Sequence, residues 1–320
     1  MVASHIYLIL LPVALDLLLW FGPHLRVKAL LEPALVNMIS TMQQSTAVEM
    51  RPVLDNLQSV WRLFLEQYNL LSLLSTFPIG VPSMMSGDLP THTPLGLPMQ
   101  IEIGSFGQLV LGGLACSLIG LTLGSIYFAS IAHACHEQMP EPDCDLALVA
   151  KNHTPAFRPG VIAWQTLQSL ALVILLSAIL LIVLIPSVIM TSFLALISVA
   201  VAQIALLLIS FSVLWLLVPM AFSPHGIYLC GLSVINALIT SARIVRHSLS
   251  GTGFFLLATI ILYQGMNILW HFPVETSWMR LVGIIGNAFI VSGLLAASFF
   301  YYRAGLAYVQ AVSKQVAVQK

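Results

Sequence analysis

Six long apolar stretches limit what this chain can fold into more than any other feature of its sequence. A helix that crosses the hydrocarbon core of a bilayer needs about 20 mostly apolar residues. The first stretch is the weakest candidate because it is short and contains Pro12 and Asp16, and Pro186 precedes the fourth. The stretches are residues 6–21, 106–132, 161–185, 191–218, 253–270 and 281–302. They predict an all-α, polytopic transmembrane helix bundle of about six spans, with residues 1–320 forming a single integral membrane domain.

The composition indicates the same class of protein. Charged residues make up 8% of the chain and hydrophobic residues 59%, with a mean hydropathy of +0.97, whereas soluble domains are about 25% charged. Twelve Lys and Arg residues balance twelve Asp and Glu residues, so there is no basic field to attract nucleic acid. We therefore expect the lipid bilayer to be the main partner, and we expect no nucleic-acid binding.

The largest region between the stretches, residues 24–105, is predicted to be an ordered extracytoplasmic insertion. A less regular helix is expected over residues 27–42. A second, amphipathic helix is predicted by apolar residues at spacings of three and four: Leu54, Leu57, Trp61, Phe64, Tyr68 and Leu71. This stripe could rest on the membrane surface or pack as a cap on the outer ends of the spans. Its opposite face has mixed charge, unlike the Lys/Arg-rich face of surface-binding helices, which favours the cap.

Prolines and glycines dominate the end of this insertion, FPIGVPSMMSGDLPTHTPLGLPMQIEIGSFG, and exclude a continuous helix there. The alternation in MQIEIGSF predicts a short strand. Such backbone cannot lie bare in lipid, because its amides would have no hydrogen-bond partners. It must lie outside the membrane or re-enter it under cover of protein. We favour a plain connecting loop over the lining of a vestibule.

A further amphipathic helix is predicted over residues 227–249, between the fourth and fifth spans. Its polar residues recur at steps of three and four, at Ser233, Asn236, Thr240, Arg243 and His247. We expect this helix to lie at the cytoplasmic interface, with Arg243 and Arg246 near lipid phosphates.

A stripe of small residues indicates how the bundle is held together. In lipid, close approach of backbones and hydrogen bonds between helices replace the hydrophobic effect as the main source of helix association. Small residues at successive i, i+4 positions form a smooth groove on the second span, at Gly112, Cys116, Gly120 and Gly124. The partner in this groove could be another span or a second copy of the protein, so a homo-oligomer or a membrane-protein partner stays open.

Six polar side chains are predicted to lie within the spans: Asp16, Gln165, Gln203, Gln264, Asn267 and Asn287. A carboxylate at mid-bilayer costs about 2.5–3.5 kcal/mol on insertion scales, so Asp16 should be neutral, paired or facing water. Amides in hydrocarbon need partners on neighbouring helices. Polar contacts between helices are the favoured interpretation, and a polar path for a solute is the alternative.

The segment HACHEQMPEPDCD holds the candidate metal ligands, His133, Cys135, His136 and Cys144. Its spacing, H-x-C-H-x₇-C, matches no standard zinc finger. We therefore expect no metal site and no cofactor, and cysteines on the cytoplasmic side are expected to be reduced rather than bridged. His225 and His271 are isolated near membrane boundaries. The sequence contains no nucleotide-binding loop, zinc-protease motif or serine-hydrolase motif.

Lys and Arg residues in the short loops predict the orientation, because cytoplasmic loops carry an excess of them. With the N-terminus inside, the inner segments carry seven of the twelve: Lys151, Arg158, Arg243, Arg246, Arg303, Lys314 and Lys320. The other five are Arg280 and four residues of the long insertion, which weigh little under the rule. We expect both termini to be cytoplasmic.

Two parts of the sequence resemble known proteins. LLPVALDLLLWFGPHL and FPIGVPSMM resemble a group of uncharacterised bacterial six-span membrane proteins. VPMAFSPHGIYLCGLSVINALITSARIVRHSLSG is similar to the membrane domain associated with glycerophosphodiester phosphodiesterases, with matches at Pro219, Gly231, Ala237, Ser241 and Arg246. The resemblance covers about 60 residues and implies a fold and a location in the bacterial cytoplasmic membrane. It implies no enzyme activity, because the phosphodiesterase of that family is a separate soluble domain that is absent from this sequence.

These observations predict a class of protein more sharply than an activity. We expect a membrane protein that is not an enzyme and that acts as a scaffold, an accessory subunit or a protein of the membrane environment. The alternative is a transporter or permease for a small solute or ion, in which Asp16 and the intramembrane amides line the path. A lipid-modifying enzyme would need a reactive constellation that the sequence does not contain.

Overall fold

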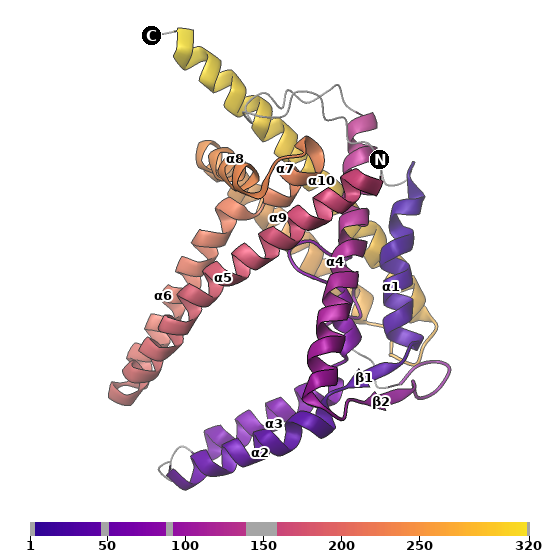
Figure 1. Cartoon of the computed structure of the whole chain (residues 1–320), viewed down its shortest axis with the longest axis vertical. Coiled ribbons are helices and arrows are strands. Elements are labelled where there is room, and N and C mark those ends of the chain that lie inside the picture. The colour runs from indigo at the N-terminus through magenta and orange to yellow at the C-terminus, as the bar shows by residue number, and fades with distance from the viewer. Residues whose placement is uncertain (1–3, 46–50, 88–91, 139–158, 319–320) are drawn as a thin grey trace.

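Five helices of the computed structural model are long and apolar enough to cross a membrane. The structure describes residues 4–45, 51–87, 92–138 and 159–318. Within these ranges the five are α4 (Phe106–Glu137), α5 (Pro159–Ile197), α6 (Val199–Leu217), α9 (Leu249–His271) and α10 (Met279–Val318). Their lengths and compositions confirm the predicted fold class, an all-α bundle in a membrane protein (Figure 1).

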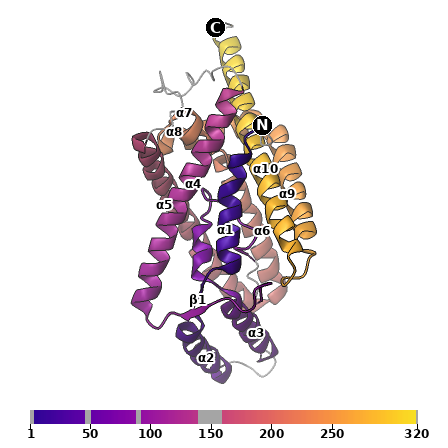
Figure 2. The ribbon, with the colours of Figure 1, turned by 90° about the vertical axis from the view of Figure 1, so that its right-hand side faces the viewer.

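The first apolar stretch forms a shorter helix with the predicted bounds. A 3₁₀ turn, η1 (Ile6–Ile9), continues directly into α1 (Leu10–Phe21), and together they fall short of the roughly 20 residues of an untilted span. One face is completely packed, since Leu15, Leu19 and Trp20 are buried in the main core. Figure 2 shows α1 lying along α4 and α10, so this stretch is an integral part of the bundle.

The turn between the third and fourth apolar stretches lies at Ser198 and not at Pro186. Helix α5 continues through Pro186 to Ile197, and Ser198 has extended backbone with φ −160° and ψ 126°. The predicted break is therefore wrong. Pro186 lacks the N–H that would donate to the Ile182 carbonyl, so the helix continues with one hydrogen bond fewer, which a helix in an apolar environment tolerates. The Ser187 hydroxyl adds a hydrogen bond at the next residue, to the Val183 carbonyl at 2.6 Å.

Beyond this turn, the hairpin of α5 and α6 projects from the bundle. The first half of α5 packs inward, through buried residues that end at Leu176. Its second half contacts α6, and no residue of α6 is buried. We call residues 177–217 the α5–α6 arm. Figure 1 shows the arm leaning away from α4.

The amphipathic region after the fourth span is two helices rather than the single one predicted. Helix α7 (Ser223–Cys230) is buried throughout, and Gly231 ends it with φ +63°, a left-handed conformation that favours glycine. Helix α8 (Val234–His247) follows, with Arg243, Arg246 and His247 exposed. The Ser241 hydroxyl donates to the Pro219 carbonyl and accepts from the Phe222 amide, which fastens α8 to the end of the fourth span.

The two ends of the bundle differ in what they carry. Helix α1 begins and α10 ends at the same end as α7 and α8 (Figure 1). At the opposite end, a two-stranded parallel sheet pairs β1 (His24–Arg26) with β2 (Gln100–Glu102). The short strand expected in MQIEIGSF is thus confirmed, while β1 was not predicted.

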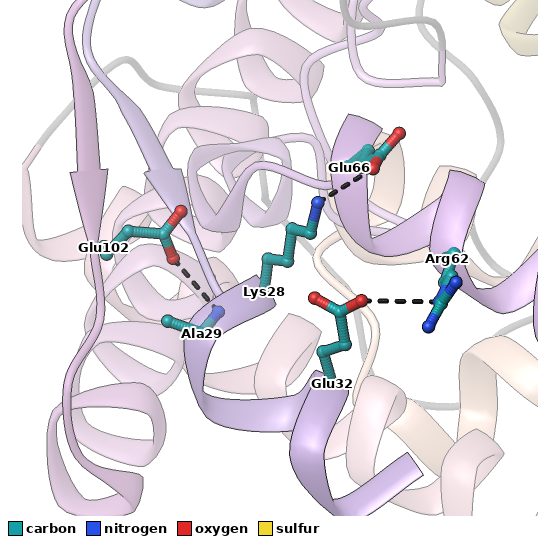
Figure 3. Close-up of polar contacts among 6 residues, drawn as sticks. All are labelled: Lys28, Ala29, Glu32, Arg62, Glu66 and Glu102. Carbon is teal, nitrogen blue, oxygen red and sulfur yellow. Dashed lines mark hydrogen bonds and ion pairs between the residues drawn. The ribbon is translucent and has the colours of Figure 1, made fainter. Parts of the chain in front are cut away.

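Helices α2 (Lys28–Ser45) and α3 (Arg51–Gln67) confirm the two helices expected in the insertion. They form a hairpin that runs across the direction of α4 (Figure 1). Ion pairs join them, Lys28 to Glu66 at 2.8 Å and Arg62 to Glu32 at 3.4 Å (Figure 3). The apolar stripe of α3 does not cap the spans as favoured above, because Trp61 is 42% and Phe64 48% exposed.

Candidate intramembrane binding site

A segment of the insertion returns into the bundle along the small-residue groove of α4. A 3₁₀ helix, η3 (Leu70–Leu74), begins this return. A Cβ atom on Gly112 would lie 3.0 Å from the Leu70 side chain, and one on Gly124 would lie 2.5 Å from the Gly80 Cα atom. The groove therefore holds neither another span nor a second copy here. We call residues 70–86 the re-entrant segment.

The re-entrant segment is covered by protein over most of its length. The side chains of Ile79, Val81, Met84 and Met85 are buried in the main core. Local hydroxyls serve the irregular backbone: Ser75 donates to the Val81 carbonyl at 2.9 Å, and Thr76 to the Ile79 carbonyl at 2.5 Å. The favoured interpretation of a plain connecting loop is wrong, because this backbone lies beside the middle of a span and is shielded as such backbone must be.

Asp16 fixes the far end of the re-entrant segment. Its carboxylate is fully buried and accepts from the Ser83 hydroxyl at 2.5 Å, the Met84 amide at 3.2 Å and the Met85 amide at 3.0 Å. A carboxylate that accepts several hydrogen bonds satisfies donors that would otherwise be orphaned in a dry interior. Asp16 therefore has the paired environment that a carboxylate within a span requires.

A cavity of about 420 Å³ lies between the re-entrant segment and helices α7, α9 and α10. Aromatic and aliphatic side chains make up most of its wall, and Phe77, which is 83% exposed, stands at its rim. The polar groups in the wall are those of Ser75, Thr76, Ser83, Ser86, His225, Thr259, Tyr263 and Ser298. An apolar hollow with a few hydroxyls is the usual form of a small-molecule site.

His225 and Ser298 form a contact between α7 and α10 in this wall. The imidazole Nε2 lies 2.6 Å from the Ser298 hydroxyl oxygen, and that hydroxyl donates to the Leu295 carbonyl at 2.6 Å. Because the hydroxyl proton is already engaged, Nε2 acts as the donor. The other nitrogen, Nδ1, is buried without a side-chain partner among the described residues, and the remaining polar neighbour of the imidazole is the Phe222 backbone. The pair therefore lacks the orienting third group of a nucleophile–base system, and His225 is not isolated as expected.

Thr259 and Tyr263 are the cavity hydroxyls best placed to meet a ligand. They lie four residues apart on α9, so both face the same side of that helix. Neither hydroxyl has a hydrogen-bond partner within the described part of the chain, whereas those of Ser75, Thr76 and Ser83 are used locally. Sequence analysis missed this pair, although the i, i+4 spacing of Phe255, Thr259 and Tyr263 was a signal for it.

The six polar residues predicted within the spans are not brought together. Gln203 on α6 and Gln264 on α9 are exposed, Asn267 is half-buried, and Gln165 and Asn287 are buried in different helices. None of the six lines the cavity. Of the six, Asp16 has the hydrogen bonds that hold the re-entrant segment in the bundle, to Ser83, Met84 and Met85.

The candidate metal ligands do not converge within the described residues, where no group of three His, Cys, Asp or Glu residues could hold a metal ion. His133 pairs with Glu137 at 3.3 Å, and the Cys135 thiol contacts the Ala296 carbonyl on α10. Successive positions on a helix point in different directions, which separates these side chains. His136 also lies on α4, whereas Cys144 lies outside the described residues.

The cysteines also differ from expectation in their redox state. Cys116 and Cys135 are free thiols, whereas Cys230 is disulfide-bonded. The expectation that Cys230, in or against the membrane, takes part in no disulfide is wrong.

Comparison of the chain with protein-family models, with curated proteins and with solved structures found no match. The resemblances to uncharacterised six-span membrane proteins and to the phosphodiesterase-associated membrane domain stay predictions.

Proposed function

We propose that this protein is a non-enzymatic membrane protein whose cavity binds a lipid or another amphiphile from the surrounding bilayer. The observation that carries the proposal is the cavity itself, which is apolar over most of its wall and lies beside a segment buried at the depth of the spans. The hydroxyls of Thr259 and Tyr263 would receive the polar part of the ligand, and Phe77 at the rim would contact its chain. This role falls within the expected class of accessory or membrane-environment proteins.

The His225–Ser298 pair supports a binding role over a catalytic one. Its hydroxyl proton is engaged with a backbone carbonyl, and Nδ1 of the imidazole has no carboxylate partner among the described residues. Without an activated nucleophile, the cavity offers recognition and no bond cleavage.

Solute transport is the second candidate function, and the arrangement of polar groups supports it less well. A path needs polar groups that follow one another through the bundle, whereas Gln203 and Gln264 are exposed on different helices and Asn287 is buried in a third. The exchange of Asp16 for Asn and of Gln264 for Leu tests this function in proteoliposomes. A solute flux that falls in both variants would support transport, and no flux in the unaltered protein would remove it.

We further propose that the protein lies in the bacterial plasma membrane with both termini cytoplasmic. The segments predicted to be cytoplasmic carry seven of the twelve Lys and Arg residues of the sequence, which supports this orientation. The disulfide-bonded Cys230 at the end of the bundle that carries the termini stands against it, because disulfides persist in oxidising compartments. A reporter that fluoresces only in the cytoplasm, fused after the C-terminus, decides between the two orientations. Fluorescence would support cytoplasmic termini, and its absence would indicate the opposite orientation.

Lipid retention tests the binding function directly. Native mass spectrometry of the detergent-purified protein should show about one tightly held lipid per chain. Val291→Trp, which fills the cavity, should lose it, and Thr259→Val with Tyr263→Phe should weaken it about tenfold, since two hydrogen bonds are worth about 1 kcal/mol each or less in lipid. Thr122→Val is the matched control, because Thr122 is exposed on α4 outside the cavity.

All these variants should elute as the same folded species. Retention that is equal in Val291→Trp and in the unaltered protein would contradict the proposal, as would an unaltered protein that carries no lipid.

A further inference from the structure

The apolar face of α3 is left uncovered by the rest of the described chain. We define the α3 aromatic face by four exposed side chains, Val60, Trp61, Leu63 and Phe64, which are between 42% and 64% exposed. The Trp61 and Phe64 rings meet edge to face with centroids 5.7 Å apart, and Phe64 lies 5.3 Å from Tyr68. The face is therefore a continuous aromatic surface with no partner in this structure.

The charged side of α3 is occupied by α2. Lys28 and Glu32 on α2 pair with Glu66 and Arg62 on α3 (Figure 3), and Gln43 donates to Asp55 at 2.8 Å. These contacts lie on the side of α3 away from Phe64. The Lys28–Glu66 and Arg62–Glu32 pairs join opposite charges, whereas Asp55 accepts from the neutral amide of Gln43.

The direction of the α3 aromatic face follows from Tyr68, which contacts Phe64 just beyond the end of α3. Tyr68 is half-buried, and it packs in a cluster with Leu65, Leu70 and Leu109 of α4. Burial, with a smaller effect of Cys116 on α4, raises the pKa of Tyr68 above its ordinary value. The stripe of Phe64 and Tyr68 thus points toward the side on which α4 enters the membrane.

Helix α4, which Tyr68 contacts through Leu109, carries exposed apolar side chains on its other faces. On α4, Phe106 is 69%, Leu111 72% and Leu114 59% exposed. These side chains belong to a helix long and apolar enough to span, so their environment is hydrocarbon. An amphipathic helix that runs across the spans, with aromatic residues on the side of the bilayer, matches the geometry of interfacial helices.

We propose that α3 lies in the headgroup region of the bilayer, at the end of the bundle opposite the termini, with Trp61 and Phe64 inserted among the lipids. Aromatic rings are favoured at this depth. Because both ion pairs of the hairpin lie on the opposite side of α3 from Phe64, apolar burial drives the contact, and a zwitterionic lipid is sufficient. The proposal concerns a surface distant from the cavity and does not depend on lipid binding there.

Photocrosslinking in phosphatidylcholine vesicles tests this placement. With benzoylphenylalanine at position 64, irradiation of the full chain should give a phospholipid adduct on the α3 peptide, detected by mass spectrometry. The same probe at Ser59, which is exposed on α3 outside the aromatic face, should give at least fivefold less. Adducts to protein, equal lipid adducts at both positions, or no lipid adduct at position 64 would overturn the proposal.

Hydrogen exchange gives a second measurement that does not rely on the probe. Phe64→Asp should raise the exchange of the α3 amides several-fold in vesicles while leaving α4 unchanged, and Ser59→Asp should not. Equal exchange in Phe64→Asp and the unaltered protein would contradict the placement.

Discussion

The re-entrant segment and the α5–α6 arm show two opposite ways in which this chain meets lipid. The re-entrant segment has irregular backbone and is buried between α4 and α1, where the Asp16 carboxylate accepts from its N–H groups and hydroxyls donate to its carbonyls. The arm is two regular helices joined at Ser198, mostly apolar, with no buried residue in α6. Lipid can act as the solvent for a helix that satisfies its own hydrogen bonds, whereas irregular backbone at the same depth needs protein around it.

This contrast predicts where the structure is sensitive to substitution. Changes in the contacts of the re-entrant segment should lower stability strongly, because no lipid can replace them. Changes on the arm should have small effects, because no residue of α6 is buried against the rest of the described chain.

Asp16→Ala should have the largest effect. The substitution leaves the amides of Met84 and Met85 without their acceptor, and each unsatisfied buried donor costs about 1–3 kcal/mol. We expect the free energy of unfolding to fall by about 4 kcal/mol, measured by steric trapping in bicelles. Asp16→Asn, which keeps the size and one acceptor oxygen, should lose less. Equal stability of Asp16→Ala and the unaltered protein would remove the distinction between segment and arm.

Gly124→Ala should follow, since the added Cβ atom would lie 2.5 Å from the Gly80 Cα atom. Overpacking typically costs about 1–3 kcal/mol, and here the neighbour is backbone that cannot rotate away. The matched control is Gly265→Ala on α9, where nothing lies within 4 Å of the new atom. It should be neutral or slightly stabilising in the same assay. If both variants unfold alike, residues 70–86 do not occupy the groove.

The α2–α3 hairpin is an intermediate case that pH can probe. Glu66 accepts a hydrogen bond from Lys28. This bond, together with the positive charge of Lys28, holds the pKa of Glu66 below its ordinary value. The stabilisation is therefore fully present above the unfolded pKa of about 4.3 and is lost as the pH falls through the lower, folded pKa. An exposed pair contributes about 0–1 kcal/mol. The protection of the α2 and α3 amides, measured relative to the intrinsic exchange rate at each pH, should fall on acidification, and Glu66→Gln should remove that part of the pH dependence.

Leu207→Ala on the arm should have the smallest effect. This side chain is 69% exposed, and surface substitutions usually change stability by less than about 0.5 kcal/mol. The same steric-trapping assay measures it beside Asp16→Ala. A loss above about 1 kcal/mol would mean that a protein, such as a second copy of this chain, covers the arm in the membrane.

Sequence reasoning reached the fold through the long apolar stretches, which tolerate no other class at this composition. The bounds of α1 and the start of α4 agreed closely, since both depend on local patterns around Phe21 and Phe106. The turn at Ser198 was missed because Pro186 is a stronger local signal than a serine, yet a long apolar helix accommodates it.

The candidate site was largely invisible for a different reason. Its contacts join residues that are far apart in the chain, such as Asp16 with Ser83 and His225 with Ser298. The groove of α4 was visible as a pattern, but its occupant has no periodicity of its own. Burial of the re-entrant segment is set by tertiary packing, which no spacing rule reports.

Hydrogen–deuterium exchange of residues 79–86 in nanodiscs tests most directly whether this segment is buried within the bundle. Exchange over hours, as slow as in the middle of α4, is the result expected for backbone packed against Gly124 and held by Asp16. Exchange within seconds, as fast as in an exposed loop, would contradict the account.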